Sequence, residues 1–335
     1  CRLVQCTFLM ILHSSRVIHS VWMKMPVADG ESICKVPVHM SKIYKENLAM
    51  TNTLLFIHAL TGLHPGSGAA LGLVDLPVQR ERHTQWPTIP ASAIKGGLRD
   101  AGRERLKPGH GGNRKETNEK NEWLVTAFGP ATSDDNAHAG ALAFTDARIL
   151  AFPVRSLKGV FAWVTCPAVI SRLKRDMSMT GISVPDWQMP GLSTGQAALP
   201  ADSPLRVDHN KLILEEFDFQ ADSNLDDQAK EVAAWIAGQA FRDHATQERA
   251  KAHLAILSDD DFTHFVRFAT EVTARIGLDY ERKPVKPGAL FYQELLPPET
   301  LLYSVVMAHD SRKGGSNKLA AGALMSDFEK SLPEV

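Results

Sequence analysis

Residues 62–99 read GLHPGSGAALGLVDLPVQRERHTQWPTIPASAIKGGLR. The first half of this stretch is rich in glycine and proline, which predicts a long loop. Pro87 and Pro90 then exclude a helix until Ser92, which is a favourable N-cap residue. The stretch therefore predicts a glycine-rich loop that runs into the start of a helix.

A helix is predicted from Ser92 to about Leu106. Apolar residues recur on one of its faces at i, i+4 and i+7: Ile94, Leu98 and Ala101. Basic residues stand on the opposite face at i, i+4 and i+8: Lys95, Arg99 and Arg103. Such a stripe is either a solvated face or a ridge that contacts phosphates. Gly96 and Gly97 favour the second reading, because each costs the helix roughly 1 kcal/mol yet lets a polyanion approach the backbone.

Apolar runs on both sides of this stretch predict a mixed fold. Residues 54–60 have the pattern of a buried strand. Further strands are predicted at 141–150, 157–165, 211–219, 272–278, 288–296 and 300–308. Helices are predicted at 167–176, 226–244 and 260–271. These elements interleave without the regular spacing of parallel βαβ units, so the sequence favours an α+β fold over a doubly wound sheet.

Two further segments read as loops. Residues 108–121 are rich in Gly, Asn, Lys and Glu, which predicts a mobile loop. Residues 177–205 contain four prolines and three glycines without a clear period. Long loops of this kind are often functional, so an insertion is expected there.

The composition excludes several classes of protein. The chain has 335 residues, of which 44% are hydrophobic and 22% charged, and this excludes a collagen-like, mainly disordered or disulfide-stapled chain. The four cysteines have no zinc-site spacing, which fits a reducing, cytoplasmic compartment. No apolar run reaches the roughly 18 residues that would span a membrane.

The net charge of -1 conceals a segregation of charge. Residues 80–120 carry ten Lys and Arg against five Asp and Glu, whereas residues 200–262 carry six against fourteen. A nucleic-acid partner must therefore be recognised by a local basic patch rather than by a bulk excess of positive charge.

Residues 1–49 differ from the rest of the chain. They hold three of the four cysteines. They precede Met50, after which three polar residues lead directly into the first predicted strand. We expect them to be a disordered, non-native extension upstream of the true start, with a mobile native extension or a secretion signal as alternatives. A single domain is then expected over 50–335.

Some motifs of catalytic type have the wrong context. Residues 66–72 do not match G-x-G-x-x-G, and the G-x-S-x-G at 191–195 lacks the strand that a nucleophile elbow requires. Ser92 and Lys95 match S-x-x-K, but the companion motifs of a Ser/Lys acyltransferase are absent from the sequence. A helix cap and a phosphate ligand explain the same two residues.

One loop concentrates groups that suit phosphodiester chemistry: His64, Asp75, Arg80, Arg82 and His83. A carboxylate can hold a divalent metal or take a proton, and imidazole and guanidinium groups can stabilise phosphorane charge. The alternative is structural, with Asp75 in a salt bridge to Arg80 or Arg82.

The ordered motifs of 62–99, with 156–167 and 288–294, resemble the RAMP superfamily of CRISPR proteins, and within it the backbone subunits of type III-B (Cmr) effector complexes. The resemblance covers about 50–330. It implies an RRM-like (ferredoxin-like) palm with inserted finger and thumb segments, expected at about 107–140 and 177–205. Members normally end in a glycine-rich segment before a final strand, and none precedes Val335, so that segment is expected to be missing.

The resemblance also implies a function in antiviral defence. Copies of such a protein multimerise along a CRISPR RNA, together with other type III-B effector subunits. They cleave single-stranded target RNA at regular intervals with a divalent metal of the Mg or Mn type, and no organic cofactor or membrane is involved. One alternative is a non-catalytic scaffold that only binds CRISPR RNA. Another is an endonuclease that matures the guide, which the match over 63–99 disfavours.

The resemblance assigns roles to residues of this chain. Asp75 is the cleavage residue, as a possible metal ligand or as a base, and His64 is auxiliary. Glu294 is a further catalytic candidate, with Glu281 as the alternative. The RNA-binding candidates are Lys95, Arg99, Arg80, Arg82, Gly96 and Gly97.

Overall fold

The computed structural model describes residues 50–70, 72–130, 138–188, 191–278, 285–312 and 318–331. These residues form a mixed fold of one large sheet, a separate two-stranded sheet and helices, which confirms the α+β prediction. The predictions for residues 1–49, for Glu281 and for the end of the chain concern residues outside the described ranges.

The large sheet has eleven strands. Their order is β1 (Met50–His58), β13 (Leu301–His309), β4 (Ala147–Arg155), β5 (Phe161–Thr165), β10 (Leu254–Leu257), β6 (Gln196–Ala198), β9 (Phe217–Ala221), β8 (Lys211–Leu214) and β7 (Arg206–Val207). Two short strands pair beside this path, β2 (Thr88–Ile89) on β4 and β3 (Leu142–Phe144) on β13. β13 pairs antiparallel with β1 along its whole length. It is buried at nearly every position because both of its faces are covered, which explains its unbroken apolar run.

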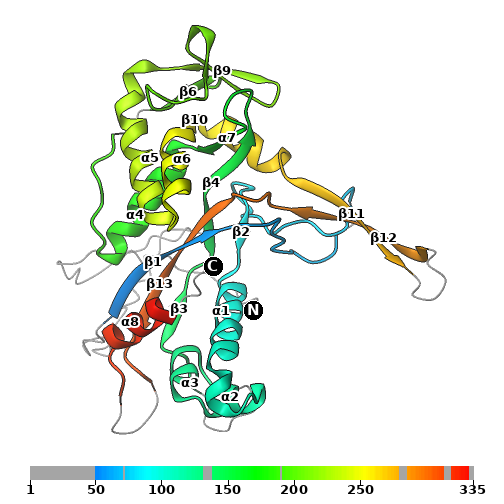
Figure 1. Cartoon of the computed structure of the whole chain (residues 1–335), viewed down its shortest axis with the longest axis vertical. Coiled ribbons are helices and arrows are strands. Elements are labelled where there is room, and N and C mark those ends of the chain that lie inside the picture. Colours follow the sequence, from blue (N-terminus) through cyan, green and yellow to red (C-terminus); the bar gives the residue numbers. More distant parts are fainter. Residues whose placement is uncertain are drawn as a thin grey trace, which may run out of the picture. The chain divides into compact units, whose positions relative to one another are not determined.

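Helices pack on this sheet and define two apolar clusters. α4 (Pro167–Thr180), α5 (Asp226–Ala240), α6 (His244–His253) and α7 (Asp259–Phe268) surround the upper part of the sheet in Figure 1. Their apolar faces join a core that includes Phe152, Trp163, Phe262 and Tyr303. α8 (Ala321–Ser331) covers β1 and β13 and closes a second cluster around Leu124 and Phe328.

α1 (Ala91–Leu106) lies where the sequence predicts a helix, but it is rotated from the expected orientation. Ile94 is buried, whereas Ala101 is exposed, so the apolar face was assigned partly wrongly. Gly102 takes its place, because a Cβ there would lie 3.4 Å from Leu124 Cδ1. Position 102 therefore faces α3 (Glu122–Phe128), and a Cβ there would make an ordinary van der Waals contact with Leu124.

The prediction of a mobile loop at 108–121 is wrong. The segment holds a 3-10 turn (Lys107–His110) and α2 (Arg114–Lys120). The side chain of Asn113 accepts a hydrogen bond from Glu116 N and so caps α2, and Asn121 caps α3 in the same way through Leu124 N. Asparagines that read as loop residues are thus helix caps.

Other boundaries shift for local reasons. The strand predicted at 211–219 is a hairpin that turns at Glu215 (φ 50°), and the helix predicted at 226–244 ends at Ala240 before α6 begins. The insertion loop predicted at 177–205 is only partly a loop. It contributes the end of α4 and β6, and it buries Trp187, Leu199 and Leu205 in the core.

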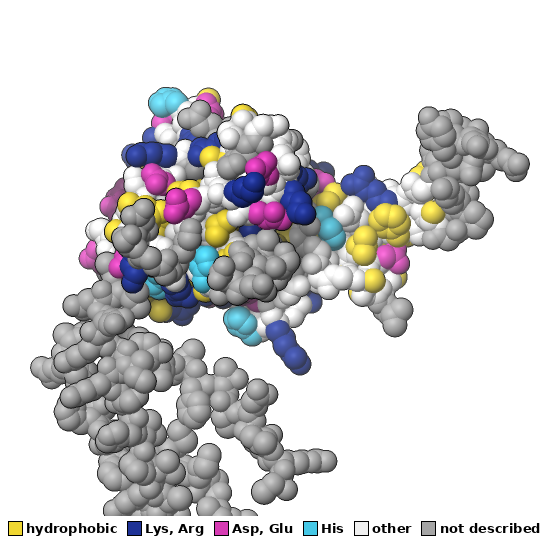
Figure 2. Space-filling model, turned by 90° about the horizontal axis from the view of Figure 1, so that it is seen from below, with side chains coloured by type: hydrophobic (Ala, Val, Ile, Leu, Met, Phe, Trp, Pro, Cys, Tyr) yellow, Lys and Arg dark blue, Asp and Glu magenta, His cyan; other side chains and the backbone are white. Residues whose placement is uncertain are grey.

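An arm of two strands, β11 (Glu271–Leu278) and β12 (Val285–Leu295), extends away from the large sheet (Figure 1). Its register places four exposed apolar side chains on one face: Val272, Ile276, Leu290 and Tyr292. Figure 2 shows apolar and basic side chains together on the surface of this arm. In the described part of the chain, none of the helices has the length and apolarity needed to cross a membrane.

Candidate functional site

The glycine-rich loop is bound to the root of the arm through its backbone. Leu63 exchanges two hydrogen bonds with Leu296, at 2.9 and 2.8 Å. Leu76 N donates to Tyr292 O and Leu76 O accepts from Glu294 N, both at 3.0 Å. The loop thus acts as a further edge of the arm, and it holds the predicted residues His64 and Asp75 against β12, the strand that carries Glu294.

Within the described residues, one oxygen of the Asp75 carboxylate is fixed by a hydrogen bond. Its Oδ2 accepts a hydrogen bond of 2.7 Å from Tyr292 N. Within the described residues no ion pair joins Asp75 to Arg80 or Arg82, so the structural salt-bridge alternative is wrong. No hydrogen bond or ion pair to the second carboxylate oxygen occurs among the described residues.

His64 has a defined tautomer at this site. Its Nδ1 lies 2.7 Å from Glu294 O, and a carbonyl can only accept, so Nδ1 carries the proton. In the neutral imidazole with this tautomer, Nε2 is the nitrogen that carries the lone pair. A Cβ at Gly66 would stand 2.7 Å from this Nε2, so the ring occupies space that only glycine leaves open.

Glu294 is an anchor in this geometry. It is 7% exposed, and its carboxylate accepts from Val78 N at 2.9 Å, Arg80 Nη2 at 2.6 Å and Thr270 Oγ1 at 2.8 Å. A carboxylate whose oxygens already accept three hydrogen bonds, one of them from a guanidinium, is engaged inside the protein and is poorly placed to move a proton. Arg80 is likewise engaged inside the protein, whereas Arg82 is exposed.

A divalent metal finds few ligands here. No group of three or more His, Cys, Asp or Glu side chains that could hold a metal occurs among the described residues. Asp75 offers one carboxylate oxygen. Because Mg²⁺ is commonly bound through one or two carboxylates together with substrate phosphates and water, Asp75 fits an ion shared with a nucleic acid but not one caged by protein.

A basic surface lies along α1, apart from the loop that carries Asp75. Lys95 Nζ donates to Leu142 O at 2.9 Å, and burial, then Arg99 and Arg312, lower its pKa. Arg99 bonds Asn118 Oδ1 at 3.0 and 3.2 Å and so ties α1 to α2, and burial, then Arg103, lower its pKa. Both side chains are half-buried beside the apolar face, so the predicted ridge opposite that face is only partly realised.

An open cavity of about 670 Å³ adjoins this surface. It is lined by the first turn of α1, by Lys95, His309 and Arg312, and by the segments 128–130 and 138–144. Gly96 and Gly97 are exposed beside it, and a Cβ at either would meet nothing within 4 Å. Packing inside the described chain therefore gives no reason for two glycines in this helix.

The family model of the RAMP superfamily matches residues 56–323. The chain belongs to the RAMP superfamily. This RAMP protein is 39% identical over 254 residues to the CRISPR system Cmr endoribonuclease Cmr4 of Pyrococcus furiosus, covering 76% of this chain and 80% of the relative. It is 25% identical over 277 residues to the CMR subunit Cmr4 of Saccharolobus solfataricus, covering 77% and 84%.

Solved structures agree with this membership. Oligomeric Cmr4 from Pyrococcus furiosus matches with a TM-score of 0.60 and 31% identity, over 85% of this chain and 89% of that one. A chain of a type III-B Cmr-beta complex bound to cognate target RNA matches with a TM-score of 0.55 and 21% identity, over 78% and 85%, and shows the fold alone. The resemblance to the RAMP superfamily and its palm fold is confirmed.

Sequence reasoning brought together the right loop but missed what holds it. The backbone of Tyr292, the Thr270 hydroxyl and the Val78 amide are partners that no motif marks. The only available signal was the apolar run at 289–292, which predicts a strand but not its neighbour.

Proposed function

We propose that this RAMP protein is a backbone subunit of a type III-B CRISPR effector that binds CRISPR RNA, multimerises along it and cleaves target RNA at regular intervals. The observation that carries the proposal is the geometry of Asp75. Its carboxylate is fixed by Tyr292 N, is free of ion pairs in the described chain, and stands at the root of the projecting arm. The relative named an endoribonuclease has the same family fold at 39% identity.

The site suits attack by a ribose 2′-hydroxyl on the adjacent phosphate. The 2′-oxygen forms a bond to phosphorus while the bond to the 5′-oxygen breaks, leaving a 2′,3′-cyclic phosphate and a 5′-hydroxyl. The free oxygen of Asp75 or Nε2 of His64 takes the 2′ proton, and a proton returns to the leaving oxygen. Positioning the RNA is then the main task of the protein.

Divalent-metal dependence is part of the proposal. The ion would be held by the Asp75 oxygen and by the RNA, and it would supply charge neutralisation at the phosphate. The residues of this chain would still position the RNA and accept the proton, and the ion would add the charge neutralisation.

The arm β11–β12 fits the thumb of the family better than residues 177–205 do. Residues 177–205 bury Trp187 and Leu199 and add β6 to the large sheet, so most of that segment cannot project. The arm projects with an apolar face, and Asp75 lies at its root. A thumb that inserts beside a target nucleotide would therefore place that nucleotide next to Asp75.

The α1 surface fits the guide strand. Lys95 and Arg312 line one cavity beside Gly96 and Gly97, and a phosphate backbone can approach a helix closely only where Cβ atoms are absent. Further copies of this chain, other type III-B subunits and single-stranded target RNA complete the proposed partners.

The test is an assembly reconstituted from this protein, a guide RNA and companion subunits. A labelled cognate target is expected to yield products at regular intervals, and a target without complementarity is expected to stay intact. Cognate binding without cleavage by this subunit would favour the alternative, a non-catalytic scaffold that binds CRISPR RNA.

Gly97→Ala is expected to have opposite effects on stability and on RNA binding. It should stabilise α1 by about 0.5–1 kcal/mol and weaken guide binding about tenfold, because a methyl group would stand in the open surface. Gly102→Ala is the matched control, since it stabilises the same helix while its Cβ faces Leu124. Thermal unfolding and guide titration measure both. Equal guide affinity in the two variants would contradict the α1 assignment.

Gly66→Ala tests His64 without altering its chemistry. The added Cβ meets His64 Nε2 and must displace the ring, so target cleavage is expected to fall about tenfold while target binding holds. Gly72→Ala in the same loop meets nothing within 4 Å and serves as the control. Single-turnover rates measure the effect, and a wild-type rate for Gly66→Ala would remove His64 from the reaction.

A further inference from the structure

The turn at residues 80–87 is fixed to its surroundings on several sides. Arg80 Nη1 donates to Gln85 O at 2.9 Å and to Val266 O at 2.8 Å, while Nη2 pairs with Glu294. Trp86 is 4% exposed and donates from Nε1 to Thr263 Oγ1 at 2.9 Å. The two ends of the turn are thus tied to α7 and to the root of the arm.

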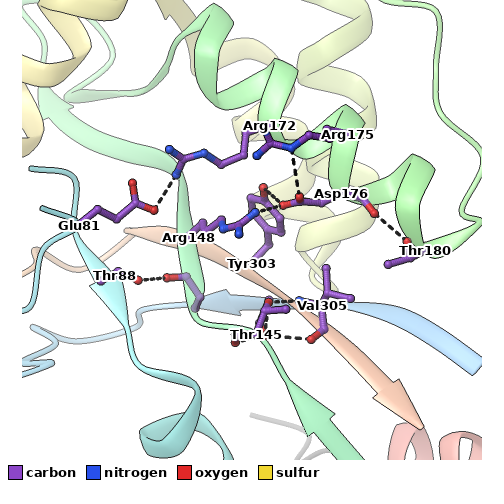
Figure 3. Close-up of polar contacts among 12 residues, drawn as sticks. Glu81, Thr88, Thr145, Arg148, Arg172, Arg175, Asp176, Thr180, Tyr303 and Val305 are labelled. Atoms are coloured by element: carbon purple, nitrogen blue, oxygen red, sulfur yellow. Dashed lines mark hydrogen bonds and ion pairs between the residues drawn. The ribbon is translucent and has the colours of Figure 1, made fainter. Parts of the chain in front are cut away.

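Glu81 ties the same turn to α4. Its Oε1 lies 2.7 Å from Arg172 Nη1, and both side chains are about 15% exposed (Figure 3). The Arg172 guanidinium also lies 5.0 Å from the centroid of the Trp86 ring. The Thr84 hydroxyl donates to the other oxygen of Glu81 at 2.7 Å. Glu81 and Thr84, which lie on either side of the tip residues 82 and 83, are therefore held in place through Arg172 of α4.

Desolvation makes this ion pair a weak source of stability. Taking both charges out of water offsets most of their attraction, so an apolar contact of the same size would stabilise the fold equally well. The pair instead fixes the relative orientation of the two side chains, because a guanidinium and a carboxylate meet in a narrow range of geometries. Arg172 thereby sets the orientation of the turn relative to α4.

The tip of the turn is open to solvent. Arg82 and His83 are both exposed, and no hydrogen bond or ion pair of the Arg82 guanidinium occurs in the described part of the chain. His83 Nε2 is 3.8 Å from Glu81 Oε2, with its side chain 75% exposed. The ordered turn fixes the backbone of Arg82, so binding through this side chain does not also have to order the turn.

We propose that the turn 80–87 is a preorganised contact for an RNA phosphate, made by Arg82, and that Arg172 is its positioning residue. The inference rests on the proposed function, since it takes RNA as the ligand. A planar guanidinium matches phosphate oxygens better than a point charge does, and the tip lies on the same turn as Arg80, which anchors Glu294 at the arm's root.

The experiment uses the assembled complex with Arg82→Ala, Arg172→Ala and the double variant. Binding of a guide strand alone and of a target strand to the guide-loaded complex are titrated separately over a range of salt. Arg82→Ala is expected to weaken one of the two about fivefold and to reduce its salt slope by about one, as expected for one lost phosphate contact. The strand affected identifies whose phosphate Arg82 contacts.

Arg172→Ala is expected to reproduce most of that loss, and the double variant is expected to be no weaker than Arg82→Ala, because one contact cannot be lost twice. The matched control is Arg175→Ala on the same helix, since Arg175 is 63% exposed and its one described ion pair, at 3.9 Å, is with Asp176. The exchange Glu81→Arg with Arg172→Glu is expected to restore the salt slope.

A purely structural role would look different. Arg172→Ala would then lower the unfolding temperature, leave the salt slope unchanged and let Arg82→Ala exert its full effect in that background, and this pattern overturns the proposal. If Arg172→Ala fails to fold, Arg172→Lys and Glu81→Gln carry the same comparison. Failure of the wild-type complex to bind RNA would overturn the proposed function, whereas wild-type binding with unaffected variants would overturn this inference alone.

Discussion

Replacing Asp75 with alanine is expected to slow target-RNA cleavage by about 100-fold or more while target binding stays near the wild-type level. The reason lies in the position of the carboxylate. One oxygen is held by Tyr292 N, and the other has no ion pair within the described chain, so the group is placed but not neutralised. Cleavage rate and target binding are measured side by side on the reconstituted complex.

Asp75→Asn separates charge from anchoring. The amide oxygen can still accept from Tyr292 N, so the loop is expected to keep its place on β12. We expect the asparagine variant to cleave nearly as slowly as the alanine variant, because neither side chain carries the negative charge that takes a proton or attracts a cation. Wild-type cleavage by Asp75→Asn would reduce Asp75 to an anchor and direct the search for the nuclease to another subunit.

Titration of Mg²⁺ or Mn²⁺ extends the same measurement. Wild-type cleavage is expected to require the ion, and Asp75→Asn is expected to need a higher concentration for any residual activity. Metal-independent cleavage by the wild type would contradict the metal part of the proposal. Proton transfer by Asp75 or His64 would remain.

The sequence predicted most of the fold because periodicity is local. The strand at 300–308 and the helix from Ser92 stand out by their own residues, and the structure has both within two residues of the predicted ends. Elements set by partners distant in sequence were missed. The four residues of β10 are too few to mark a strand until β5 and β6 pair with them on either side.

The same distinction holds at the site. His64 and Asp75 share one loop with the motifs that carry the resemblance, so their proximity could be predicted. The different environments of Arg80 and Arg82 could not, although the two are separated by one residue. Arg80 points to Glu294, which is 214 residues away, and only the fold decides which arginine is buried in that pair.

Replacing Glu294 with alanine is expected to have the largest effect on stability. Glu294 and Arg80 are a buried pair, with side chains 9% and 16% exposed, and removal of one partner leaves the other charge uncompensated. Such a loss costs about 3–5 kcal/mol, which corresponds to a fall of about 10 °C in unfolding temperature for a domain of this size. Calorimetry of the purified protein measures it.

The double variant Arg80→Met with Glu294→Leu decides what the pair contributes. If the loss comes from the stranded guanidinium, removing both charges should recover much of the stability, since an apolar pair of similar volume avoids the desolvation cost. Cleavage should nevertheless stay low, because the Arg80–Glu294 contact also joins the turn 80–87 to the strand that holds Asp75. Stability and cleavage recovering together would show that the charges only support the fold. A stable but inactive double variant would show that they orient the site.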